Sequence, residues 1–145
     1  WTTYRAMAAD VLAHCQQAGR LPAGAPSPTA SLPLVGAQAG AHSLTQAPGL
    51  HGYGSEAANV QSLPGAERWL CPGLSQAMVR FAARHEYART VEDVLARRSR
   101  LLFLDACMAE SVAGEVASVL QEETGTDPGL AAFLAISRQY QSLPA

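Results

Sequence analysis

Lysine is absent from this chain of 145 residues, and charged residues make up only 15% of it. Every basic residue other than histidine is therefore an arginine, and the formal net charge is −2. A typical globular protein has about 25% charged residues, and a protein that binds nucleic acid usually carries a clustered basic excess. The charge balance therefore excludes nucleic acid as the expected partner.

Long apolar runs are also absent. No run approaches the roughly 20 residues that a membrane-spanning helix needs, and the first residues do not have the pattern of a signal peptide. We therefore expect no transmembrane segment. The chain begins at Trp1 without an initiator methionine, so we expect it to be a fragment of a longer protein.

Cysteine and histidine are few and scattered, with three and four residues respectively. Neither C-x-x-C nor H-E-x-x-H occurs, so we expect no metal site, and the odd cysteine count suits a reducing compartment. Cys15 and Cys107 fall on or beside apolar helical faces, and we interpret them as small core residues. We expect His42 and His51 to be solvated loop residues and His85 to be a packed histidine with one hydrogen-bonded nitrogen.

The chain does contain a series of helical patterns, in which apolar residues recur three and four positions apart. No segment alternates apolar and polar residues over the length of a strand. The sequence therefore predicts an all-α fold, a small helical domain of about five helices. The predicted helices cover residues 1–18 and then, in the helical domain, 56–63, 74–87, 90–104, 105–123 and 128–140, with stops at Gly19 and Gly125 and a break at Ser99. The expected N-caps are Ser55, Thr90 with Asp93 in a capping box, Asp105, and Asp127 followed by Pro128.

Residues 19–52 separate the first two helical patterns and are rich in proline, glycine and alanine. Proline removes a backbone donor and clashes with the preceding turn, so its repeated occurrence forbids a helix through this stretch. We expect an extended connector in which Leu32, Leu34 and Val35 pack against neighbouring helices.

One charged residue, Arg98, falls on the apolar stripe of the predicted helix over residues 90–104. A guanidinium there must reach solvent or find an acid, because an unpaired buried charge is costly. Glu86 and Asp105 are the nearest candidate partners in the sequence. Arg97 lies on the solvated side, where Asp93 precedes it at the i,i+4 spacing of a helical ion pair.

The segment E-Y-A-R-T-V-E-D-V-L-A-R-R-S-R-L-L-F-L-D at residues 86–105 closely resembles the C-terminal α-helical domain of the FAD-dependent, quinone-linked glycerol-3-phosphate dehydrogenases. Three further segments resemble that family in the same order. They are W-T-T-Y-R-A-M-A-A-D at residues 1–10, similar to the end of the flavin domain, L-P-L-V-G-A at 32–37, and Y-G-S-E-A-A-N-V at 53–60. The resemblance therefore covers most of the chain.

The resemblance implies a division of the chain into three parts. Residues 1–18 would be the terminal helix of the preceding flavin domain, residues 19–52 a connector, and residues 53–145 a C-terminal α-helical cap domain. In the resembled family the first segment follows a Gly-Gly-Lys stretch that lines the flavin and substrate site, which places Thr2 and Thr3 near the flavin. The residues alone favour a purely structural interpretation, in which these two hydroxyls cap the N-terminus of the helix.

The function also comes from the resemblance, because the residues alone identify no catalytic group, phosphate loop or nucleophile with its base. Such enzymes oxidise sn-glycerol 3-phosphate to dihydroxyacetone phosphate and pass the electrons through FAD to quinone. This chain would then be a structural cap, inactive and without FAD on its own. Its partner would be its own N-terminal flavin domain. The resemblance also leaves open that the protein forms a homodimer. The full-length protein would be cytoplasmic and peripheral at the inner face of the cell membrane.

Two other interpretations stay open. The chain could be a free-standing helical interaction module, or the same domain of a related FAD-dependent amine oxidase. The upstream reading frame separates the first alternative from the dehydrogenase, because a flavin domain would carry a G-x-G-x-x-G fingerprint. Substrate turnover by the full-length protein separates the second.

Overall fold

The computed structural model describes residues 3–24, 27–37 and 49–142. The chain divides into two compact units, Trp1–Val35 and Gly36–Ala145, which are described separately. Within the described residues there are six α-helices, and the strands are limited to one short hairpin. The predicted all-α class is therefore confirmed.

The first unit contains the helix α1 (Tyr4–Gln17) and a short 3-10 turn, η1 (Pro28–Ala30). The predicted stop of α1 is confirmed, because Gly19 has φ of +65°, a left-handed conformation that glycine adopts at little cost. The Nη1 of Arg5 donates to the carbonyl oxygen of Thr29 at 2.9 Å, which connects η1 to α1 within this unit.

The apolar residues of the first unit are not packed as the sequence predicted. No residue of α1 is buried, and Leu32, Leu34 and Val35 are all exposed. Cys15 is only partly buried, and Cys107 in the second unit is exposed, so the interpretation of both as core residues is wrong. Periodicity locates an apolar face, but it cannot tell whether a neighbouring element covers that face.

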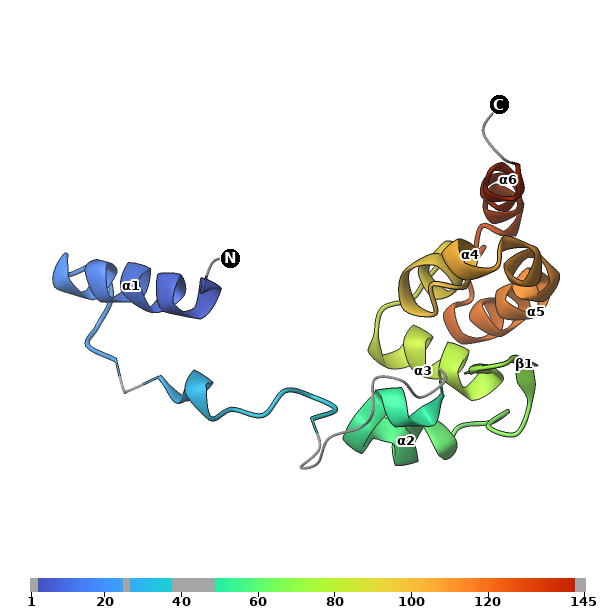
Figure 1. Cartoon of the computed structure of the whole chain (residues 1–145). Coiled ribbons are helices and arrows are strands. Elements are labelled where there is room, and N and C mark those ends of the chain that lie inside the picture. Colours follow the sequence, from blue (N-terminus) through green and yellow to red (C-terminus); the bar gives the residue numbers. More distant parts are fainter. Residues whose placement is uncertain (1–2, 25–26, 38–48, 143–145) are drawn as a thin grey trace. The chain divides into compact units, whose positions relative to one another are not determined.

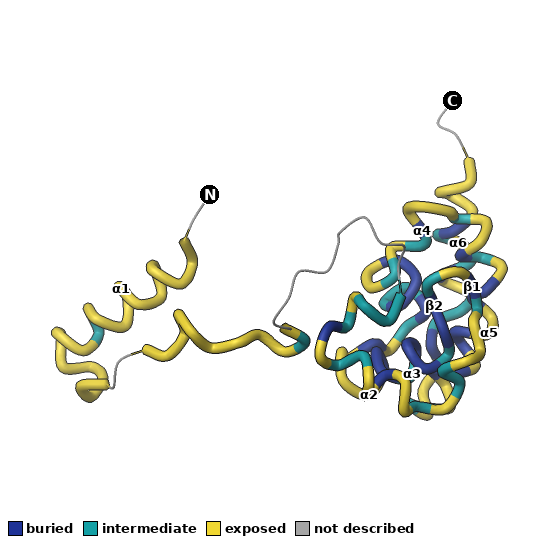
Figure 2. Tube along the Cα trace, turned by 60° about the horizontal axis from the view of Figure 1, so that its bottom comes forward, coloured by how far each residue is buried: buried dark blue, intermediate teal, exposed yellow. Residues whose placement is uncertain are grey.

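The core of the second unit forms where α5 (Ala106–Thr124) packs against both α3 (Gln76–His85) and α6 (Leu130–Gln141) (Figure 1). Figure 2 shows that the buried residues are concentrated in this second unit. The largest fully buried side chains include Phe133, Leu95, Leu120, Val60, Val79 and Val116. Burial of such side chains contributes about 1.5–3 kcal/mol each, so this cluster is the main source of stability.

Two predicted helix starts between α3 and α5 are confirmed. Thr90 and Asp93 form a reciprocal capping box, in which Asp93 Oδ2 accepts from the Thr90 amide at 2.9 Å and Thr90 Oγ1 accepts from the Asp93 amide at 3.1 Å. This box leads into η3 (Asp93–Arg98), a π-helical turn. After the short helix α4 (Leu101–Leu104), Asp105 caps α5 by accepting from the Met108 amide at 2.9 Å.

The break near Ser99 is also confirmed. The Ser99 amide donates to the Val94 carbonyl, five residues back, and Arg100 has φ of +58°. The wide turn therefore ends where the chain enters a left-handed residue, and α4 starts in a new direction. Five-residue spacing of this kind has no signature in the apolar periodicity, so the sequence predicted only the break.

Three other predicted boundaries are wrong. Residues around Pro72-Gly73 form a hairpin, with β1 (Trp69–Cys71) antiparallel to β2 (Leu74–Ser75), where we expected no strand. The helix α2 (Ala57–Gln61) begins after Glu56 and has no side-chain cap, so Ser55 is not its N-cap. Finally, α6 begins after Gly129, because the Asp127 side chain instead closes a turn by accepting from the Gly129 amide at 2.9 Å.

The backbone before α2 passes close to the backbone of Gly36. Within η2 (Leu50–Glu56), Gly54 is buried with φ of +55° and ψ of −125°, a combination open essentially to glycine alone. The carbonyl oxygen of Gly36 accepts from the Ser55 amide at 3.1 Å. A Cβ on Gly54 would lie 1.8 Å from that same oxygen. The Y-G-S segment therefore needs its glycine for both conformation and space.

Candidate functional site

Thr3, one of the two residues expected near a flavin, occupies the N-cap position of α1. Its carbonyl oxygen accepts from the Met7 amide at 3.1 Å. The Thr3 side chain makes no capping hydrogen bond, so its interpretation as a capping hydroxyl is wrong. Thr2 lies outside the described residues. The proximity of either residue to a flavin therefore stays a prediction.

The described residues do not by themselves fit an FAD molecule. A dinucleotide site needs a parallel strand, a glycine-rich turn and a helix whose N-terminus meets the pyrophosphate. Among the described residues, the strands are those of the antiparallel hairpin β1–β2, of three and two residues. The described residues alone therefore do not form a complete FAD site.

A pocket of about 540 Å³ lies within the second unit. It is lined by η2, the hairpin turn, one side of α3 from Met78 to Ala82, η3 and α4. Its walls are mainly apolar, from side chains such as Met78, Val94 and Leu101, and its polar side chains include those of Tyr53, Glu86 and Arg98. An apolar pocket with a few convergent polar groups is the usual form of a binding site.

Arg98 is held at this pocket by three hydrogen bonds. Its Nε donates to Glu86 Oε2 at 3.2 Å, its Nη1 donates to the Asp93 carbonyl oxygen at 3.0 Å, and its Nη2 donates to the Glu86 carbonyl oxygen. The prediction of an acidic partner is thus confirmed, and of the two candidates it is Glu86 rather than Asp105. The arrangement joins the C-terminal end of α3 to the π-helical turn, and it leaves the side chain about 28% exposed rather than buried.

Tyr53 is a pocket residue that was not predicted as a site residue. Its ring packs edge-on against Phe81, with the ring centroids 5.4 Å apart. The pKa of Tyr53 is raised to about 12, chiefly by burial and then by the nearby Glu86 carboxylate, while the charge of Arg98 acts to lower it. The phenol therefore stays protonated at neutral pH and can donate a hydrogen bond. Its only signal in the sequence was the Y-G-S segment.

The remaining reactive groups do not support catalysis. Cys71 is buried, and its pKa is raised first by burial and then by the charge of Asp105, so the sulfur remains a thiol rather than the nucleophilic thiolate. His51 is partly buried and lines the pocket, contrary to the expected solvated residue. His85 is exposed with its ring 4.7 Å from that of Phe81, so the prediction of a packed histidine is wrong. The arrangement can bind a ligand but lacks an activated nucleophile.

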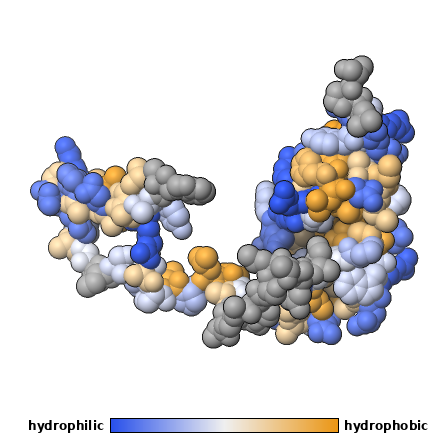
Figure 3. Space-filling model, viewed as in Figure 1, coloured by the Kyte–Doolittle hydropathy of each residue, from blue (hydrophilic) through white to orange (hydrophobic). Residues whose placement is uncertain are grey.

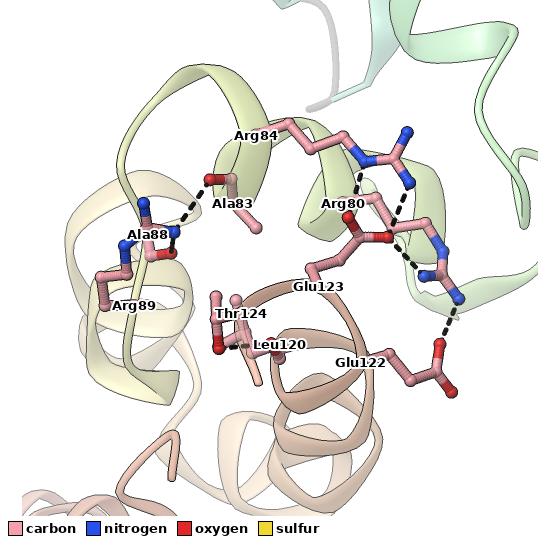
Figure 4. Close-up of polar contacts among 9 residues, drawn as sticks. All are labelled: Arg80, Ala83, Arg84, Ala88, Arg89, Leu120, Glu122, Glu123 and Thr124. Carbon is pink, nitrogen blue, oxygen red and sulfur yellow. Dashed lines mark hydrogen bonds and ion pairs between the residues drawn. The ribbon is translucent and has the colours of Figure 1, made fainter. Parts of the chain in front are cut away.

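A second polar cluster joins α3 to the end of α5 (Figure 4). Arg80 donates from Nη1 to Glu123 at 2.6 Å and from Nη2 to Glu122 at 2.7 Å, and Arg84 makes a two-pronged contact with Glu123 at 2.6 and 2.9 Å. The Arg80 side chain is only 15% exposed, and its Nε is buried and has no hydrogen-bond partner within the described residues. Each charge has an opposite partner within the cluster, so its role is to fix these two helices together.

Neither a metal site nor a membrane span is found where the structure describes the chain. No group of three or more potential ligands from histidine, cysteine, aspartate and glutamate converges in residues 3–24, 27–37 and 49–142. In the same ranges, no helix combines the length and the apolar character needed to cross a membrane.

Two comparisons with known proteins, one with family models and one with curated relatives, agree with each other. A family model described as the C-terminal domain of alpha-glycerophosphate oxidase matches residues 27–129, which include the whole pocket. The mitochondrial glycerol-3-phosphate dehydrogenase of Arabidopsis thaliana is 30% identical across 99% of this chain and 27% of its own length. The mitochondrial glycerol-3-phosphate dehydrogenase of Bos taurus is 31% identical across 88% of this chain and 20% of its own. No solved structure shows a significant match.

The chain thus spans only about a quarter of the length of these curated relatives, or less. A shorter match, to the mitochondrial glycerol-3-phosphate dehydrogenase of Schizosaccharomyces pombe, reaches 45% identity over 51 residues.

Proposed function

Because this chain belongs to the family of the C-terminal domain of alpha-glycerophosphate oxidase, we propose that it is the C-terminal helical domain of an FAD-dependent glycerol-3-phosphate dehydrogenase. The observation that carries the proposal is the Arabidopsis thaliana relative, which aligns with 99% of this chain. The resemblance inferred from residues 86–105 agrees with it. The general class of the whole protein is then an oxidoreductase.

The proposed reaction converts sn-glycerol 3-phosphate to dihydroxyacetone phosphate. The secondary alcohol becomes a ketone, and the two electrons and two protons released end on a quinone, with FAD as the cofactor of the full-length enzyme. This chain supplies none of the reacting groups. The thiol of Cys71 and the phenol of Tyr53 are both protonated at neutral pH, in agreement with a domain that packs and positions but does not react.

Within the longer protein, residues 1–18 would be the last helix of the flavin domain, with Thr2 and Thr3 near the flavin. Residues 19–52 would be the connector, and residues 53–145 the helical cap. The uncovered apolar face of α1, which includes Tyr4, Met7 and Val11, supports this division because a helix of that kind needs a packing partner. We further propose that the intact enzyme attaches peripherally to the membrane that holds its quinone.

The test starts with the upstream reading frame of this chain. It should encode a strand followed by G-x-G-x-x-G and a helix, with an acidic residue about 20 positions further on. The full-length product should then be isolated with one FAD per chain and should reduce a quinone analogue when given sn-glycerol 3-phosphate. An upstream frame without the fingerprint, or a flavoprotein that oxidises only an amine, would overturn the proposal.

A further inference from the structure

The polar groups of the pocket have unused hydrogen-bonding capacity. Arg98 has five N–H donors, of which three are engaged by Glu86 and Asp93. Among the described residues, the Tyr53 hydroxyl has no hydrogen-bond partner, and Glu86 has one carboxylate oxygen engaged by Arg98 and the other without one. The pocket therefore offers donors and an acceptor side by side, with a net charge near zero from the Arg98–Glu86 pair.

This combination matches a peptide amide better than a charged ligand. An amide carbonyl can accept from Arg98 or Tyr53, and an amide N–H can donate to Glu86. A phosphate or carboxylate would meet the Glu86 charge, and an ammonium would meet the Arg98 charge. The apolar lining from Met78 and Val94 fits a side chain rather than a second polar group.

The rim of the pocket carries large exposed apolar side chains. Leu104 lines the pocket and is 72% exposed, and the neighbouring Phe103 is 53% exposed. Phe103 stacks edge-on with Tyr140 of α6 at 5.5 Å, which extends the apolar surface away from the pocket. Figure 3 shows an apolar patch on this face over α4. Clustered exposed apolar groups of this kind mark an interaction surface.

We propose that the Tyr53–Glu86–Arg98 pocket and the α4 side chains Phe103 and Leu104 form the surface that binds an extended segment from the N-terminal part of the same longer polypeptide. The inference rests on the proposed function. The choice of occupant comes from the length of the relatives. This chain corresponds to 27% of the Arabidopsis thaliana relative, so most of such a polypeptide lies outside this chain and is available to dock on it. All the pocket residues also lie in the region 27–129 that matches the family model.

Amide hydrogen exchange tests the surface directly. Exchange is measured over residues 98–104 in the full-length protein and in the 145-residue chain, with the retained secondary structure checked by circular dichroism. We expect exchange in the full-length protein to be slower by about tenfold or more, because docking closes the local openings of α4. Leu104→Glu in the full-length protein should return the rate to that of the short chain, since it replaces an apolar side chain at the rim of the pocket by a charge. Tyr53→Phe, which removes one hydroxyl and keeps the ring, should return it in part.

The matched control is Trp69→Glu. Trp69 is a 50% exposed apolar side chain on the hairpin and does not line the pocket, so this substitution should leave the protection of residues 98–104 unchanged. Equal exchange in the two proteins, or equal effects of Leu104→Glu and Trp69→Glu, would overturn the inference. Protection that grows with the concentration of the short chain would also overturn it, because the occupant would then be a second copy.

The two proposals fail in different ways. A full-length protein that contains FAD and oxidises sn-glycerol 3-phosphate, yet shows no protection at residues 98–104, contradicts only the docking surface. A full-length protein without flavin contradicts the proposed function itself.

Discussion

Arg98 and Glu86 lie twelve residues apart and are joined both side chain to side chain, with Nε 3.2 Å from Oε2, and side chain to main chain. The contact closes the loop between α3 and the π-helical turn. It also sets the polar end of the pocket, since both residues line it.

Replacement of Arg98 by alanine should destabilise the domain by about 1–2 kcal/mol. It removes charge-assisted hydrogen bonds to Glu86 and Asp93, but the side chain is 28% exposed, so solvent screening reduces the loss. Arg97→Ala is the control, because Arg97 is 57% exposed and, among the described residues, bonds only to Glu92 and Asp93. Its cost should stay below about 0.5–1 kcal/mol. Urea unfolding measures both losses of stability. Equal losses for the two substitutions would contradict the conclusion that Arg98, rather than Arg97, holds α3 to the π-helical turn.

Gly54→Ala should be among the most damaging single changes in the second unit. It forces a Cβ to within 1.8 Å of the Gly36 carbonyl oxygen and places alanine in a strained conformation. We expect a loss of about 3 kcal/mol or more in the free energy of unfolding. Gly114→Ala is the matched control, because Gly114 lies in α5, where the new Cβ would meet no described atom within 4 Å beyond the adjacent backbone of its own helix. It should stabilise the chain by up to about 1 kcal/mol, and a Gly54→Ala variant as stable as the parent would show that the backbone approach is not required.

The cluster at Glu123 predicts a loss of stability in acid. Hydrogen bonds from Arg84, and then from Arg80, lower the pKa of Glu123 below its usual 4.5, despite some desolvation. The folded state therefore binds fewer protons than the unfolded state, and this contribution is complete above pH 4.5 and is lost as the pH falls through the lowered pKa. The difference in unfolding free energy between the parent and Glu123→Gln should shrink over that range. Glu115→Gln, whose partner Arg68 is exposed, should show a smaller dependence.

Tyr53 predicts the opposite dependence at high pH. Its pKa in the folded protein is raised to about 12, whereas a tyrosine in an unfolded chain ionises near pH 10. Its contribution to stability is therefore complete below pH 10 and is lost as the pH rises toward 12. Phenolate absorbance of the parent and of Tyr53→Phe should coincide up to about pH 10.5 and separate above it. A separation already near pH 10 would mean that the phenol is not buried.

Much of the second unit could be predicted from the sequence, because its signals are local. The Thr90–Asp93 capping box, the Asp105 cap and the stop at Gly125 each depend on residues within one turn. The Glu86 partner of Arg98 could be predicted because a guanidinium on an apolar stripe needs a nearby acid. The hairpin at Pro72-Gly73 could not, since strands of three and two residues are too short to show alternation.

The pocket was missed because it depends on contacts between distant segments. Tyr53 meets Phe81 and Glu86 only after η2 and α3 have packed, and nothing near Tyr53 in the sequence signals that neighbour. Conversely, Cys107 was assigned to the core from its helical position, yet α5 turns that residue to the surface. Periodicity describes a face of a helix, and tertiary packing decides which part of the face is covered.

The central claim is that this chain is the non-catalytic C-terminal part of a longer flavoenzyme, and one paired measurement tests it most directly. The visible absorption spectrum and the rate of sn-glycerol 3-phosphate oxidation, with FAD and a quinone analogue added, are recorded for the purified 145-residue chain and for the full-length protein. We expect the short chain to be colourless, helical by circular dichroism and inactive, and the full-length protein to be yellow and active. Stoichiometric flavin or measurable turnover in the short chain, or a colourless and inactive full-length protein, would contradict the claim.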